Sequence, residues 1–177
     1  GTGYVFTTFN GAWAREMDRH DTVVTAGKHV NSSYTGTSSS RANPFVMISK
    51  QDTTQEQGEC IGLNLIYSGN HYEAVETGMC DMTRIVAGIN PQSFSYMLEP
   101  GCGFEAPEAV MTYSGYGFNR MSRNMHSFVR KHIVRGKWQY KERPVLLNSW
   151  EAAYFDISER KLYELAKAGK NVGVELF

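Results

Sequence analysis

The sequence lacks an excess of charge of either sign. Lysine plus arginine and aspartate plus glutamate each number 18 in 177 residues, so the formal net charge is zero. Such a balance gives no electrostatic reason to expect a nucleic acid or an anionic membrane surface as partner. The sequence also has no apolar run near the ~20 residues of a membrane span, and no charged-then-apolar leader. We therefore expect neither nucleic acid nor membrane among its partners.

Cysteine is scarce as well. Cys60, Cys80 and Cys102 stand about 20 residues apart without a C-x-x-C pair, which favours free thiols in a reducing cytoplasm over disulfides or a zinc site. The five histidines are scattered, and His126 and His132 are six apart, which does not place them on one helix face. Nucleotide-binding and G-x-S-x-G motifs are missing. We expect no metal, no cofactor and structural roles for the histidines.

Residues 1–116 have the pattern of antiparallel β-structure. "FSYMLEPG" and "FEAPEAVMTYSG" continue this pattern, and "SGNHY" predicts a turn that makes residues 59–78 a β-hairpin. Residues 31–44 are predicted to form a polar, solvated loop. Short segments rich in β-branched and aromatic residues, bounded by Gly, Asn, Pro or Ser, predict strands at Tyr4–Phe9, Pro44–Ser49, Glu59–Gly69, His71–Gly78 and Thr83–Ile89. Repeated strands of this kind indicate a β-sandwich.

The hydrophobic period changes at Gly117. From Phe118 to Ile133 the apolar residues recur every three or four positions, which predicts one amphipathic helix that ends near Gly136. Its basic residues lie mostly off the apolar stripe, and in a chain without net charge they favour a solvated face over a nucleic-acid site. The polar "KWQYKERP" then predicts a linker.

The last 35 residues have a different pattern. "PVLLNSW" predicts a buried strand, "ISERKLYELAKAGK" a helix with Ser158 as its N-cap, and "VELF" a second strand. A strand, a crossover helix and a strand form a parallel βαβ unit. Parallel sheets are covered on both faces, so this unit predicts the beginning of a larger α/β domain. The sequence is accordingly interpreted as a fragment that ends within a strand.

Polar and aromatic residues follow the first of these strands. In a (β/α)₈ barrel, active sites lie in the loops after the strands, where Asn148, Trp150, Glu151, Tyr154 and Asp156 fall. The indole of Trp150 could stack on a sugar ring or equally cap the barrel core. For Glu151 and Asp156 we favour structural roles in the loop and at the helix N-terminus.

These segments together resemble a known family. "RPVLLNSWEAAYFDISERKLYELAKAGKNVGVELF" resembles the start of the catalytic barrel of α-galactosidases of glycoside hydrolase family 36. "NPFVMIS", "GLNLIYSGNHYEAVE", "RIVAGINPQSFSYMLEPG", "FEAPEAVMTYSGYGFNRMS" and "HIVRGKW" resemble the β-supersandwich that precedes that barrel. The resemblance implies a mainly β chain: residues 1–116 in the antiparallel supersandwich, 117–142 as linker helix and connection, and 143–177 as the first βαβ of an incomplete barrel.

The resemblance also implies a function. Family members remove terminal α-linked galactose from melibiose- and raffinose-type sugars with retention, using two carboxyl groups ~5 Å apart. In the family both groups lie on later barrel strands, so no catalytic residue is expected in this chain, and the fragment alone should be inactive. Trp150 matches a family tryptophan that lines the galactose pocket. The family also implies a homotetramer, with no metal or cofactor.

Two alternatives remain open at the level of sequence. The same scaffold could serve an α-N-acetylgalactosaminidase or a galactosyltransferase acting on raffinose-type sugars, because the discriminating loops would come later. The chain could instead be a carbohydrate-binding or structural β-sandwich, in which the last helix packs on the sheet.

Overall fold

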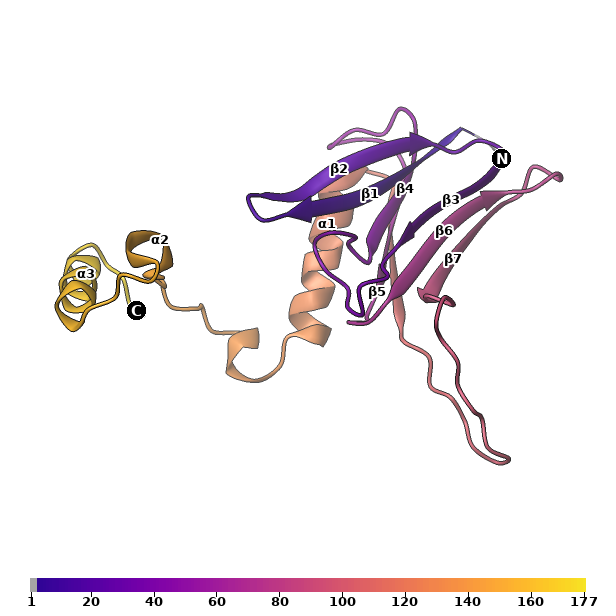
Figure 1. Ribbon diagram of the computed structural model, residues 1–177. Coiled ribbons are helices and arrows are strands. Elements are labelled where there is room, and N and C mark those ends of the chain that lie inside the picture. The colour runs from indigo at the N-terminus through magenta and orange to yellow at the C-terminus, as the bar shows by residue number, and fades with distance from the viewer. Residues whose placement is uncertain (1–2) are drawn as a thin grey trace. The chain divides into compact units, whose positions relative to one another are not determined.

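The computed structural model describes residues 3–177 of the chain (Figure 1). It divides into two compact units, one that ends at Phe128 and one from Val129 to Phe177. None of the helices in the described residues is long and apolar enough to cross a membrane.

Two antiparallel sheets form the first unit, as the predicted sandwich requires. The larger sheet has the order β2-β1-β4-β5-β8 and the smaller has the order β3-β6-β7. The strands of the larger sheet are β1 (Tyr4–Ala12), β2 (Arg15–Val23), β4 (Phe45–Lys50), β5 (Cys60–Leu65) and β8 (Ala109–Ser114). Those of the smaller sheet are β3 (Gly27–Ser32), β6 (His71–Thr77) and β7 (Thr83–Ile89).

The larger sheet is covered on both faces, because successive side chains of a strand point to opposite sides. On β4, Val46 and Ile48 belong to a buried cluster that also holds Val75 of the smaller sheet. Met47 belongs to a second cluster that contains Phe118 of α1 (Gly117–Phe128). The first unit therefore has three layers: the smaller sheet, the larger sheet and α1.

Helix α1 begins where the turn before β5 caps it. The amides of Phe118 and Asn119 donate to the carbonyls of Thr54 and Gln55, at 3.1 and 3.0 Å. Gly117 has φ +76°, and a Cβ there would lie 2.6 Å from backbone atoms of the turn, so only glycine fits. The α-helix ends at Phe128, earlier than predicted, and continues as a π-helical turn (Val129–Ile133) and a 3₁₀ turn (Gly136–Gln139).

The predicted hairpin over residues 59–78 is wrong. Strand β5 pairs with β4 and β8, whereas β6 pairs with β3 and β7, so the chain passes from one sheet to the other between them. A turn signal between two strands does not specify which sheet or which edge the next strand joins. Residues 94–101 form no strand either, and β2 and β3 escaped prediction because neither has a clear apolar alternation.

The second unit contains the predicted parallel arrangement in a reduced form. Leu146 and Leu176 form a parallel bridge, and the Leu147 amide donates to the Leu176 carbonyl at 2.9 Å. Between these segments lie α2 (Trp150–Ala153) and α3 (Glu159–Asn171). The side chain of Ser158 accepts a hydrogen bond from the Lys161 amide at 3.3 Å, which confirms it as the N-cap of α3.

Candidate functional site

Trp150 stands at the start of α2, directly after the first parallel segment. Its amide donates to Oδ1 of Asn148 at 2.8 Å, which fixes the turn between the segment and the helix. Its ring makes edge-to-face contacts with Tyr154 and Phe155, at centroid distances of 5.5 and 5.1 Å. The side chain is nevertheless 46% exposed. The arrangement holds an indole in place and leaves part of it open to a ligand.

The two carboxylates of this loop have local partners. The Tyr154 hydroxyl donates to Glu151 at 2.9 Å, and Lys161 donates to Asp156 at 2.6 Å. The hydrogen bond and positive charge of Lys161 lower the pKa of Asp156. The structure thus brings Trp150, Glu151 and Tyr154 together and turns Asp156 toward α3. These local partners suit the structural roles that we favoured for Glu151 and Asp156.

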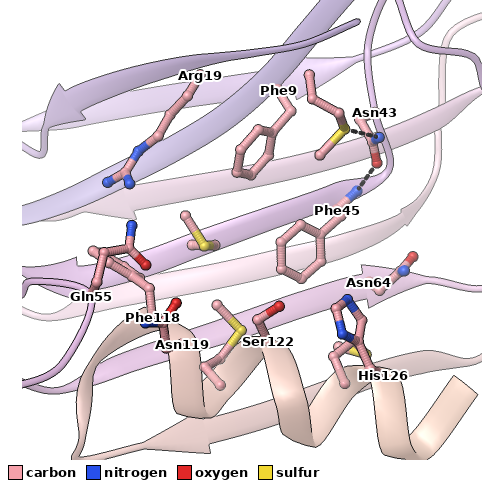
Figure 2. A pocket seen from close by; sticks show the side chains of 14 residues that line it. Phe9, Arg19, Asn43, Phe45, Gln55, Asn64, Phe118, Asn119, Ser122 and His126 are labelled. Carbon is pink, nitrogen blue, oxygen red and sulfur yellow. Dashed lines mark hydrogen bonds between the residues drawn. The ribbon is translucent and has the colours of Figure 1, made fainter.

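A second candidate site lies in the first unit, between α1 and the larger sheet (Figure 2). It is a pocket of about 530 Å³, which is within the usual range of small-molecule sites. It is lined by Phe9, Met17, Arg19, Asn43, Phe45, Met47, Gln55, Asn64, Phe118, Asn119, Met121, Ser122, Met125 and His126. Sequence reasoning missed it, because strands and a helix far apart in sequence form its walls and no motif links them.

A buried polar network lies behind one wall of this pocket. His71 and Glu73 are completely buried on β6 and share a hydrogen bond of 2.8 Å, while the other ring nitrogen of His71 contacts the Ala42 carbonyl at 2.7 Å. Asn31 donates to Glu73 and to the Asn43 carbonyl, at 2.9 and 2.8 Å. Burial alone would lower the pKa of His71, but Glu73 and the Ala42 carbonyl outweigh it and raise that pKa.

The described part of the chain has no set of side chains that could bind a metal ion. Among residues 3–177 no three His, Cys, Asp or Glu side chains are grouped so that they could hold an ion. The three cysteines are free, with Cys60 buried and Cys80 and Cys102 exposed.

Comparison with protein families identifies both parts of the chain. Residues 1–99 match the family model of the glycosyl hydrolase family 36 N-terminal domain, and residues 103–177 match that of melibiase. The chain belongs to glycosyl hydrolase family 36. This family membership confirms the resemblance to family 36. The expected supersandwich and the expected start of a barrel both depend on that resemblance.

Curated family 36 relatives carry α-galactosidase names. α-Galactosidase AgaA of Geobacillus stearothermophilus is 38% identical over 94% of the chain, and the probable α-galactosidase G of Aspergillus terreus is 41% identical over 96%. In both cases the chain spans 23% of the relative's own length.

Solved structures of family 36 enzymes have the same fold. A variant of AgaA from G. stearothermophilus in complex with stachyose superposes with a TM-score of 0.93 at 37% identity, over 98% of the chain and 24% of its own. Another variant of AgaA, in complex with 1-deoxygalactonojirimycin, gives the same values. The α-galactosidase of Lactobacillus brevis has a TM-score of 0.93 at 40% identity.

Proposed function

We propose that the chain is part of a retaining α-galactosidase that removes terminal α-linked galactose from melibiose- and raffinose-type oligosaccharides. The observation that carries this proposal is the match of residues 103–177 to the melibiase family, joined in one chain to the family 36 N-terminal domain. Relatives named α-galactosidase, one of them solved with stachyose, support the substrate class. We also propose that 1-deoxygalactonojirimycin, with which a relative was solved in complex, binds and inhibits the full-length enzyme.

Within that enzyme we assign Trp150 to the wall of the galactose pocket. The partly exposed indole can pack against the apolar C–H face of the sugar, while Tyr154 and Phe155 keep it from rotating away. A retaining mechanism needs two carboxyl groups ~5 Å apart. Glu151 and Asp156 are engaged by Tyr154 and Lys161, which suits structural roles. We place both catalytic groups on later strands of the barrel, as the family resemblance implies. The 177-residue chain alone should therefore be inactive.

The test is Trp150→Ala in the full-length enzyme. Loss of one stacking contact of about 0.5–1.5 kcal/mol beyond the lost buried area should lower kcat/KM for melibiose by at least about tenfold. Trp138→Ala is the matched control, because Trp138 lies before the first parallel segment and outside the loop that follows it. Its ring contacts Lys137 and Arg143 instead. Unchanged kinetics in Trp150→Ala would remove Trp150 from the pocket. No hydrolysis of any α-galactoside by the wild-type enzyme would overturn the proposed function itself.

We also propose that the full-length enzyme is a cytoplasmic homotetramer. Residues 91–108 form an arm that projects from the sheets (Figure 1). Phe94, Tyr96 and Phe104 pack on one another along it, and Met97 beside them is 81% exposed. Such an apolar arm suits burial against another subunit. The exposed free thiols of Cys80 and Cys102 suit a reducing compartment.

The division into 1–116, 117–142 and 143–177 remains part of the proposal. Helix α1, which we assigned to the connection, packs within the first unit. The connection would then begin after Phe128.

A further inference from the structure

We propose that the pocket between α1 and the larger sheet is a non-catalytic sugar site, which binds a neutral sugar residue within the first unit. This goes beyond the proposed function, because it assigns binding to the first unit, where no catalytic role is expected. The pocket holds about 530 Å³, room enough for a small ligand.

The inner wall of the pocket is apolar and is formed by phenylalanine and methionine side chains (Figure 2). Phe9 and Phe45 stack at a centroid distance of 5.8 Å, and Met47 and Met121 lie beside them. Phe45 remains only partly buried. A sugar ring has an apolar face of C–H groups, which packs well against such a wall.

Neutral hydrogen-bonding side chains complete the lining. Four amides (Asn43, Gln55, Asn64 and Asn119), the hydroxyl of Ser122 and the imidazole of His126 reach the pocket. An amide both donates and accepts, as a sugar hydroxyl does. The structure gives the side chains of Asn64, Ser122 and His126 no hydrogen-bond partner among residues 3–177, so they are free to bind a ligand.

Charge in the pocket argues against an ionic ligand. Arg19 is the one lining side chain with a permanent charge, and it is already engaged. Its Nε lies 2.9 Å from Asp21, and its guanidinium covers the Phe118 ring at 4.7 Å. A neutral, polyhydroxylated ligand suits this lining better than a phosphate or a carboxylate does.

The wall that carries Asn43 is fixed in advance. The Asn43 side chain accepts a hydrogen bond from the Phe45 amide at 3.0 Å and donates to the Met17 sulfur at 3.4 Å. Its carbonyl is held by Asn31, and that of the preceding Ala42 by His71. These contacts fix the wall locally, while the buried Oε1 of Glu73 has no hydrogen-bond partner among the described residues. Binding therefore does not have to order this side of the pocket.

The test uses saturation-transfer NMR of galactose with the full-length enzyme, because galactose is not consumed. Saturating 1-deoxygalactonojirimycin occupies the catalytic pocket, and a galactose signal should remain. Ser122→Trp fills the second pocket and should abolish that remaining signal. Ser127→Trp, on the same helix but outside the pocket lining, should preserve it.

Asn64→Ala provides a milder probe that does not fill the pocket. Loss of one hydrogen bond should weaken galactose binding roughly 2- to 10-fold under the same inhibitor. Thermal unfolding of each variant checks that it is folded. The proposal of a second site is overturned if neither variant reduces the galactose signal that remains under the inhibitor. It is also overturned if the wild type shows no such remaining signal. An inhibitor without any effect on the wild-type signal counts against the proposed function instead.

Discussion

The two units of the chain are stabilised in different ways. In the first, both faces of the larger sheet are covered, and side chains such as Val46 and Val75 have no exposed area. In the second, from Val129 to Phe177, only Ala153 and Gly169 are buried, while Leu146 is 62% and Phe155 88% exposed. An antiparallel sandwich completes its core locally, whereas a parallel βαβ unit buries its apolar faces only against further strands and helices. The first unit should therefore unfold cooperatively and the second only weakly so.

The largest effect is expected where the first unit buries charge. His71→Leu leaves Glu73 buried without its main partner, and it also strips the Ala42 carbonyl of its contact. Breaking a buried pair in this way destabilises by about 3–5 kcal/mol. Urea unfolding of the 177-residue chain measures the change. His20→Leu on exposed β2 is the control and should stay within about 0.5 kcal/mol. Equal losses in the two variants would contradict the role of the pair.

A pair of leucines compares the units directly. Leu65 is 2% exposed in the first unit, whereas Leu176 is 50% exposed in the second. Leu65→Ala should cost about 2–5 kcal/mol, and Leu176→Ala less than about 1 kcal/mol. Hydrogen exchange of the β4 and β5 amides reports the first change and that of the α3 amides the second. Similar costs would mean that the second unit has a core of its own.

The buried pair should also make the stability of the first unit depend on pH. Because the folded protein raises the pKa of His71, the stabilisation is fully present below the unfolded pKa of about 6.5. It is lost as pH rises through the raised value. The free energy of unfolding should decrease between about pH 6 and pH 8. This decrease should be smaller than the destabilisation that His71→Leu causes.

Glu73→Gln is the control for this dependence. Asn31 and His71 both contact the same oxygen of Glu73, and the amide oxygen of a glutamine can accept from Asn31 and from a neutral His71 protonated at Nδ1, so the fold should persist. The part of the pH dependence that comes from His71 should disappear. An unchanged slope in this variant would assign the dependence to other groups.

The smallest effect is expected at the N-cap of α3. Ser158→Ala removes the hydrogen bond to the Lys161 amide and should destabilise α3 by about 1 kcal/mol, seen as faster exchange of its first-turn amides. Ser149→Ala is the matched control, because Ser149 precedes α2 without a side-chain cap bond. The prediction fails if both variants change exchange equally.

Patterns that are local in sequence predicted much of this architecture. The alternation of β-branched residues located β4, β6 and β7, and the Ser158 cap with the apolar runs around α3 predicted the parallel arrangement of Leu146 and Leu176. The elements were predicted because each depends on residues that lie within one segment. The role of Trp150 stays a prediction, made because Trp150 follows a predicted strand, where a barrel places its active site.

What escaped prediction depends on contacts between distant segments. Strands β5 and β6 follow one another along the chain, yet they pair with different strands and join different sheets. The pocket under α1 combines Phe9 with Ser122, more than a hundred positions apart. The buried His71 was expected to be structural, but nothing near it in sequence marked Ala42 as its partner.

Strand β2 forms an outer edge of the larger sheet, and each of its nine residues is exposed. Its sequence, "REMDRHDTV", places acidic and basic side chains along that edge. A strand from another molecule that docked there would have to bury these charges, which is unfavourable. The charged residues of β2 thus protect the sheet against edge-to-edge aggregation. The same residues interrupt the apolar alternation, which is why the sequence pattern did not predict this strand.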